Sequence, residues 1–316
     1  MNRTYSLFDL HCDTALCLAR KKLHLLDNDD CHISLNKAAY LDKYVQIFAV
    51  FTPRSMSNSE GFDNFISTSS YLIDELNINS EIIAPLCLDR SDIVNAIKNK
   101  KRCAILAVED VRILDGDINR IDLLVNRGVR FVTPVWGGES CIGGAHNTEC
   151  GLTEFGQKAV KEMSKRGIIM DLSHSNEKTA DGIIEAVKEV GGKAIATHSN
   201  SASVYMHTRN LLDKHFENIK ELGGIVGISL CPPHISAEAA PDIDSIIRHI
   251  DRYMELGGEN TVAIGGDLDG TDLPTGFNDI SDIYKISDRL SALGYSDIII
   301  NKIFFDNAYN FAVNNL

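Results

Sequence analysis

Short apolar runs alternate with longer segments of helical apolar spacing along most of this 316-residue chain. Polar residues or glycines bound each apolar run, which is typical of strands buried in a parallel sheet. Eight such runs predict strands at Tyr5–Cys12, Tyr44–Thr52, Cys103–Glu109, Val129–Trp136, Gly167–Ser173, Lys193–Thr197, Gly224–Leu230 and Thr261–Gly266.

The segments between these runs carry apolar residues at positions i, i+3 and i+4, which predicts amphipathic helices. The predicted helices include Glu60–Leu76, Ile118–Asn126, Phe155–Lys165, Glu177–Val190, His215–Leu222 and Ile243–Leu256. Several of them end next to a glycine that can adopt the left-handed C-cap conformation, namely Gly128, Gly167, Gly191 and Gly257.

Eight strand-helix units of this kind predict an α/β fold, a (β/α)8 TIM barrel that forms a single domain over residues 1–316. The alternative, a doubly wound open sheet, would bind a ligand at a switch point. No GxGxxG or GxxxxGK[ST] loop follows any predicted strand. We also find no internal repeat or low-complexity linker, so one closed barrel is the favoured fold.

The charge balance excludes two classes of partner. The chain has 31 Lys and Arg against 44 Asp and Glu, a formal charge of −13, so no nucleic acid and no anionic membrane is an expected partner. Eight scattered cysteines without a CxxC pair indicate reduced thiols. The first residues lack a secretory signal, and no segment approaches the ~20 apolar residues of a membrane span. We therefore expect a cytoplasmic protein.

Polar residues gather where the predicted strands end. All of the carboxyl ends of a parallel barrel open onto one face, where barrel enzymes build their active sites. The candidate site residues at these ends are His11, Asp13, Glu109, His174, His198 and Asp267. Three imidazoles and three carboxylates on one face would suit a pair of Zn, Mn or Fe ions. Two ions sharing one carboxylate lower the pKa of a water and supply hydroxide for attack on a carbonyl or phosphoryl group.

Each of these residues has an ordinary structural explanation when it is taken alone. A histidine at a strand end is commonly a hydrogen-bonded structural residue, and a carboxylate there can cap the next helix. The joint placement of all six favours a site. We expect most of the remaining histidines to be surface or structural residues. They are His24, His32, His146, His207, His215, His234 and His249.

The sequence resembles the membrane dipeptidases, also called renal dipeptidase-like metallopeptidases, which have amidohydrolase-type barrels. The similarity covers essentially the whole chain, and the order and spacing of its motifs make it specific. These motifs are FDLHCDTAL (8–16), AVED (107–110), GLTEFGQKAVKEMSKRGIIMDLSHSN (151–176), ATHSNS (196–201), HTRNLLD (207–213) and IGGDLDG (264–270).

The resemblance implies a metal-dependent dipeptidase that holds two divalent ions, with zinc the expected metal. Its implied ligands are His11 and Asp13 for one ion, His174 and His198 for the other, and Glu109 as the bridge between them. It also implies that Asp267 is the catalytic acid and base that activates the bridging water and protonates the leaving amine.

Two further positions concern the substrate. Arg209 matches the arginine that holds the free carboxylate of a dipeptide, and the alternative is a structural salt bridge, with Asp213 as the candidate partner. Trp136 stands where relatives resembling the mammalian enzyme carry a substrate-contacting histidine. We expect Trp136 in place of histidine to alter the stabilisation of the developing oxyanion and the preference for substrate side chains. Glu139 or His146 could replace the missing polar group, and either could equally be an ordinary loop residue.

Three functions remain open from the sequence. The first is a dipeptidase, with the dipeptides and the acceptance of a C-terminal D-residue unassigned. The second is a binuclear amidohydrolase that acts on another small amide, such as an N-acyl amino acid or a lactam. The third is a metal-binding protein that has lost catalysis, suggested by the Trp136 departure. The substrate is expected to be a small molecule, and a homodimer is an open possibility.

Overall fold

Eight parallel strands form a barrel in the computed structural model, which describes residues 4–316. The barrel strands are β1 (Tyr5–Cys12), β2 (Leu41–Phe51), β4 (Arg102–Glu109), β5 (Val129–Thr133), β6 (Ile169–Asp171), β7 (Ala194–Ile195), β8 (Val226–Ile228) and β9 (Val262–Ile264). Their order is β7-β6-β5-β4-β2-β1-β9-β8. The two ends of this order meet through a parallel bridge between Ala196 and Val226. The predicted barrel is therefore confirmed.

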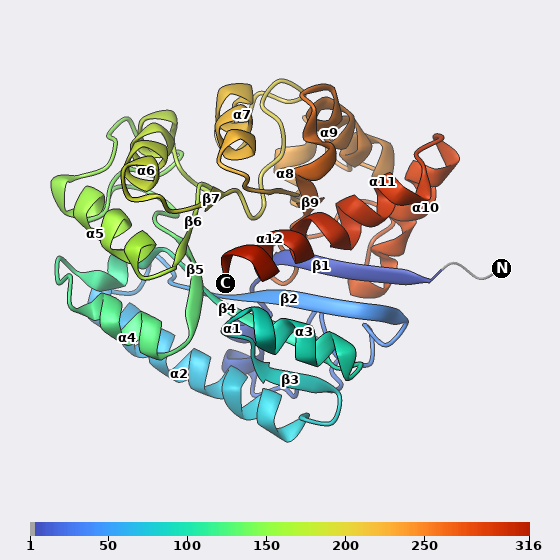
Figure 1. The fold of residues 1–316 in the computed structure, drawn as a ribbon, viewed down its shortest axis with the longest axis horizontal. Coiled ribbons are helices and arrows are strands. Elements are labelled where there is room, and N and C mark those ends of the chain that lie inside the picture. Colours follow the sequence, from blue (N-terminus) through green and yellow to red (C-terminus); the bar gives the residue numbers. More distant parts are fainter. Residues whose placement is uncertain (1–3) are drawn as a thin grey trace.

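Helices surround the strands on the outside of the molecule, as Figure 1 shows. They are α1 (Thr14–Lys21), α2 (Asn58–Ile78), α3 (Arg90–Lys98), α4 (Arg120–Asn126), α5 (Glu154–Lys165), α6 (Glu177–Val190), α7 (Asp213–Glu221), α8 (Pro232–Ile235), α9 (Ile243–Glu255), α10 (Tyr284–Ala292), α11 (Asp297–Asn301) and α12 (Asn307–Asn315). Among residues 4–316, no helix is both long and apolar enough to cross a membrane.

All six predicted helices are present, but several short elements were not predicted. One additional strand, β3 (Ile83–Leu86), pairs with the start of β4 and is not one of the eight barrel strands. Helices α1 and α3, of eight and nine residues, were not among the predicted helices. A π-helical turn at Lys302–Asp306 joins α11 to α12.

From the fourth strand onward, the predicted strands were too long. The fourth predicted strand ends at Thr133 instead of Trp136, because Pro134 has no N–H to continue the ladder. Strand β7 has only two residues, and β6, β8 and β9 have three each. The polar residues at these ends therefore lie in loops just beyond the strands.

The barrel interior is a separate apolar core. Its strand residues are Phe8, Leu10, Val45, Ile47, Ala49, Cys103, Ile105, Ala107, Phe131, Ile169, Ile195 and Ala263. Phe305 and Phe311 from the C-terminal helices join this cluster, and Lys43 near the start of β2 lies over the Phe305 ring. The C-terminal helices therefore close the end where the strands begin, which leaves the opposite end for polar side chains.

Candidate active site

Glu109 lies at the centre of the polar end of the barrel. It follows the inward-facing positions of β4, because side chains alternate along a strand. Its Oε2 atom is 3.6 Å from Nε2 of His11. Its Oε1 atom is 2.9 Å from Nε2 of His174 and 3.6 Å from Nε2 of His198. The two oxygens of one carboxylate thus face two different groups of side chains.

The first group contains His11 and Asp13 at the end of β1. The His11 Nε2 atom is 3.7 Å from Oδ2 of Asp13 and 4.0 Å from Oδ1 of Asp267. Backbone hydrogen bonds join this end of β1 to the loop after β9, with the Asp267 N–H donating to the His11 carbonyl at 3.1 Å. Among residues 4–316, the buried His11 Nε2 and Asp13 Oδ1 atoms have no hydrogen-bond partner. This group therefore brings nitrogen and oxygen atoms close together and leaves two of them available to bind a ligand.

The second group contains His174 and His198, whose Nε2 atoms are 3.0 Å apart. The Nδ1 atom of His174 donates to the carbonyl of Trp136 at 3.1 Å, since a carbonyl can only accept. The Nδ1 atom of His198 lies 2.8 Å from the Thr197 hydroxyl, which itself donates to Asp171. Both contacts place the ring proton on Nδ1 and leave the Nε2 lone pair free, which is the arrangement of metal-binding histidines.

Asp171 organises the loops of this second group. It is fully buried, and its Oδ1 accepts from the N–H groups of Ser173 and Thr197. Its Oδ2 accepts from the hydroxyls of Thr133 and Thr197 at 2.6 Å each. Four donors satisfy one carboxylate, so the residues directly before His174 and His198 are held in place without a long strand ladder.

Burial gives the site's groups unusual pKa values. Burial, with a smaller contribution from the negative charge of Asp13, raises the pKa of Glu109 to about 7 and that of Asp267 to about 8. Burial also holds the pKa values of His174 and His198 well below their usual range, so both rings are neutral. Burial opposes a charge on His11, but Glu109 and Asp13 outweigh it and raise its pKa well above the usual value.

These residues fit divalent cations. Two sets of three residues each bring their possible metal-ligand atoms within 4.8 Å of one another. One set is His11, Glu109 and His198, and the other is His11, Asp13 and Asp267. A cation beside these carboxylates would relieve the cost of burying their charges. The donor set contains no thiolate, which suits ions that accept imidazole and carboxylate.

A cavity of about 630 Å³ opens onto this cluster, lined in part by Glu109, Trp136, Arg209 and Asp267. Arg209 is only 6% exposed, and its Nε and Nη2 atoms have no hydrogen-bond partner in the part of the chain that the structure describes. Asp213 does not satisfy it, because the Asp213 carboxylate pairs with Arg252 instead. The guanidinium is therefore a buried, unpaired cation next to the cavity.

The structure distinguishes the two residues considered as replacements near Trp136. The Trp136 ring is half-buried and lies 4.7 Å from the Phe51 ring and 5.7 Å from the His174 ring, measured between centroids. Glu139 is exposed and does not line the cavity. His146 does line it, with Nδ1 2.9 Å from the Thr208 hydroxyl. Of the two, His146 is the polar side chain that the fold brings to the site.

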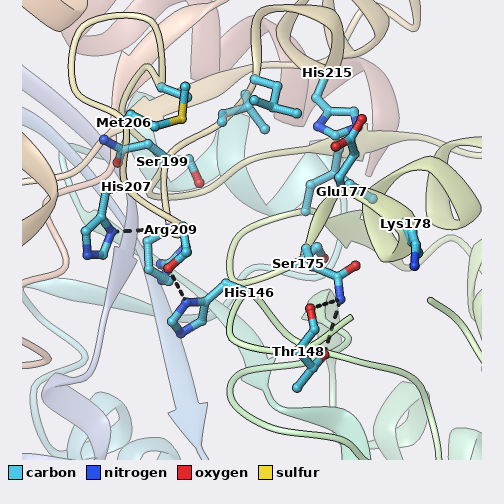
Figure 2. Close-up of a pocket in the computed structure, with 18 of the residues that line it drawn as sticks. His146, Thr148, Ser175, Glu177, Lys178, Ser199, Met206, His207, Arg209 and His215 are labelled. Atoms are coloured by element: carbon cyan, nitrogen blue, oxygen red, sulfur yellow. Dashed lines mark hydrogen bonds between the residues drawn. The ribbon is translucent and has the colours of Figure 1, made fainter. Parts of the chain in front are cut away.

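Three of the histidines outside the predicted site line the cavity, which the sequence did not indicate. His207 and His234 also line the cavity, with ring centroids 4.9 Å apart. His146, His207 and Arg209 also line a second cavity, of about 370 Å³. Figure 2 shows these three side chains close together. These residues lie in loops and not at the ends of predicted strands, so their proximity is apparent only from the fold.

Comparison with known proteins supports one family. The model of the membrane dipeptidase family, peptidase family M19, matches residues 1–311. An uncharacterised protein in the pqqA 5′ region of Klebsiella pneumoniae is 29% identical over 234 residues, which are 70% of this chain and 85% of that protein.

Solved structures share the fold. The dipeptidase AC, an M19 metallopeptidase, superposes with a TM-score of 0.91 at 23% identity, over 99% of both chains. A metallopeptidase from Rhodobacter sphaeroides, bound to a phosphinate mimic of the dipeptide L-Ala-D-Ala, gives a TM-score of 0.92 at 22% identity, over 99% of this chain and 100% of that one. The chain therefore belongs to the membrane dipeptidase family, peptidase family M19, and its function is that of a metal-dependent dipeptidase.

Proposed function

We propose that this dipeptidase holds two zinc ions between its two groups of donors. The observation that carries the proposal is the position of Glu109, whose Oε2 faces His11 and whose Oε1 faces the other two histidines. In this proposal His11 and Asp13 hold one ion, His174 and His198 hold the other, and Glu109 bridges them. Imidazole and carboxylate ligands are typical of catalytic zinc.

The ions, when bound, would polarise the substrate carbonyl and activate a water for attack. We assign proton transfer to Asp267, whose Oδ1 lies 4.0 Å from the His11 nitrogen and which lines the cavity. Its carboxylate would take the proton of the attacking water and pass it to the departing amine. A carboxyl group whose pKa burial has raised towards neutral is suited to both steps.

We assign the free carboxylate of the dipeptide to Arg209. Its two unpartnered nitrogens are the donors that a planar carboxylate accepts in a bidentate contact. A longer peptide would place an amide where this buried cation requires a carboxylate, so the site would favour dipeptides. Trp136 would contribute an apolar wall and a single N–H donor to the same cavity.

The test is a screen of dipeptides, including L–D pairs, with and without a chelator. We expect hydrolysis that the chelator abolishes and added zinc restores. The Rhodobacter sphaeroides relative binds a mimic of L-Ala-D-Ala, and we propose that this chain also accepts a D-residue at the C-terminal position. If no dipeptide is cleaved by metal-loaded protein, the dipeptidase assignment fails. Cleavage confined to amides without a free carboxylate would instead favour the broader amidohydrolase function.

The Arg209 assignment has a sharper form of the same test. We expect Arg209→Ala to reduce kcat/KM strongly for a dipeptide and much less for the corresponding dipeptide amide, which has no carboxylate to lose. Equal losses for both substrates would show that Arg209 acts on the structure of the site and not on the carboxylate.

We further propose a reducing, cytoplasmic location. The eight cysteines are all free in the structure, which is typical of proteins kept reduced inside cells. Fractionation of the native host would test this placement.

A further inference from the structure

A second cluster of metal-type donors lies beside the active site. The thiols of Cys17 and Cys31 and a carboxylate oxygen of Asp269 all lie within 4.8 Å of one another. They come from three separate segments: helix α1, the connection between α1 and β2, and the loop after β9. The fold, and no local sequence motif, brings these three side chains together.

The cluster faces the catalytic cavity on one side. Cys17 and Asp269 line the same 630 Å³ cavity as Asp13 and Asp267. Cys31 lies behind them and is 2% exposed. An ion held by the three side chains would therefore have protein on one side and the water of the cavity on the other, which leaves a fourth position for a water ligand.

The surrounding contacts hold the donors in place without using the sulfur atoms. The Asp269 carboxylate accepts from the Thr14 hydroxyl and from the backbone N–H of His32, each at 2.5 Å. Contacts of this kind orient a ligating carboxylate. The Cys17 thiol has a long contact, 4.0 Å from Sγ to the carbonyl of Asp30, and it also interacts with the Cys31 thiol. On binding an ion, the two thiols would exchange these weak sulfur contacts for bonds to the metal.

We propose that Cys17, Cys31 and Asp269 form a further cation site, selective for a thiophilic divalent ion such as Zn²⁺ or Cd²⁺, in the wall of the catalytic cavity. On binding, two S–H bonds break, two sulfur-metal bonds form and two protons leave to solvent. The two thiolates make this site softer than the imidazole and carboxylate cluster. Because two protons leave as one divalent ion binds, the net charge of the cluster does not change, but the ion and its water ligand add bulk to the cavity wall, so excess metal reduces access to the active site.

The test uses Cd²⁺ as the probe, added to reduced, zinc-loaded protein. We expect a thiolate-to-cadmium charge-transfer absorption in the ultraviolet that saturates at one equivalent per chain. Cys17→Ser and Cys31→Ser should each abolish it. The matched controls are Cys141→Ser and Cys150→Ser, which change half-buried thiols outside this cluster and should leave the absorption unchanged.

A second measurement follows the metal itself. After dialysis against excess zinc, we expect the wild type to retain one more ion per chain than Cys17→Ser, and excess zinc to inhibit dipeptide hydrolysis by the wild type more than by the variant. Absence of the charge-transfer band in the wild type, or its persistence in both serine variants, would overturn the proposal. So would a mass lower by two hydrogen atoms that reduction reverses, because it would show a Cys17–Cys31 disulfide instead.

This proposal is independent of the peptidase assignment. The cadmium absorption and the metal content are measured without substrate, so they test the cation site even if no dipeptide is cleaved. The screen in turn is unaffected if the thiols bind no metal.

Discussion

The two halves of the barrel hold their site residues in different ways. Strands β1, β2 and β4 are eight to eleven residues long and pair over most of their length. They place Glu109 in the ladder and His11 and Asp13 at the end of β1. Strands β6, β7 and β9 have two or three residues each, so His174, His198 and Asp267 lie beyond them in loops.

A buried carboxylate lies beneath the site in each half. Asp9 accepts from two backbone N–H groups, those of His11 and Gly266, both on Oδ1, and its buried Oδ2 has no hydrogen-bond partner among residues 4–316. Asp171 uses both oxygens and accepts four hydrogen bonds. The long strands need little help from side chains, whereas the short strands depend on the hydrogen bonds of Asp171.

Two of the six strand-end residues have a strained backbone. Among the six strand-end residues, His174 and Asp267 have positive φ angles, 69° and 56°, a conformation that costs non-glycine residues about 1–3 kcal/mol. Both belong to the short-strand half. That half therefore requires surrounding contacts, such as those of Asp171, to keep its residues in place.

We expect the largest effect from replacing Glu109, the residue that contacts both groups of site residues. Glu109→Ala should lose metal from both donor groups and lower turnover by about 10⁴-fold or more, because the ions supply most of the stabilisation of the developing charge. Elemental analysis and steady-state kinetics measure the two losses. Glu139→Ala, which changes an exposed loop glutamate, is the control and should match the wild type.

The second prediction separates chemistry from metal binding. Asp267→Asn should retain its metal but lower kcat by about 10²–10⁴-fold, the usual contribution of a general acid and base. Metal content and kcat are measured on the same preparation. Turnover close to that of the wild type would remove Asp267 from the proposed proton transfer.

The third prediction tests the contrast between the two buried carboxylates. Asp171→Asn replaces one accepting oxygen with an NH₂ group, so it cannot accept all four hydrogen bonds, and we expect metal affinity to fall about 10–100-fold. Asp9→Asn can place its NH₂ group at the unpartnered Oδ2 position and should change affinity little. Competition with a chelator measures both. Equal losses in the two variants would contradict the difference between the halves.

The last prediction concerns stability and pH, and not activity. Burial raises the pKa of Asp9 to about 6 from 3.8, so its ionisation disfavours the folded state. Relative to Asp9→Asn, the metal-free wild type should lose up to about 3 kcal/mol of stability as pH rises from about 4 to about 6, and no more above that. Denaturant unfolding across this range measures it. A difference between the two proteins that does not vary with pH would show that Asp9 keeps an ordinary pKa.

The sequence alone determined the barrel, because each barrel strand coincides with a short apolar run and six of the helices carry a helical period of apolar residues. It also placed six polar residues at strand ends, and a parallel barrel brings such ends to one face. Strand lengths in the second half could not be predicted, because they depend on side chains such as Asp171 competing with the ladder for backbone hydrogen bonds.

Only the tertiary structure decided which loop residues join the site. His146, His207 and His234 line the cavity from loops, and a loop's path depends on contacts that no local pattern encodes. The same holds for Arg209, whose unpaired state is visible only once Asp213 is seen to pair with Arg252. Local sequence thus determined the elements and the strand ends, because hydrogen bonding and side-chain alternation are local. The cavity wall depended on long-range packing.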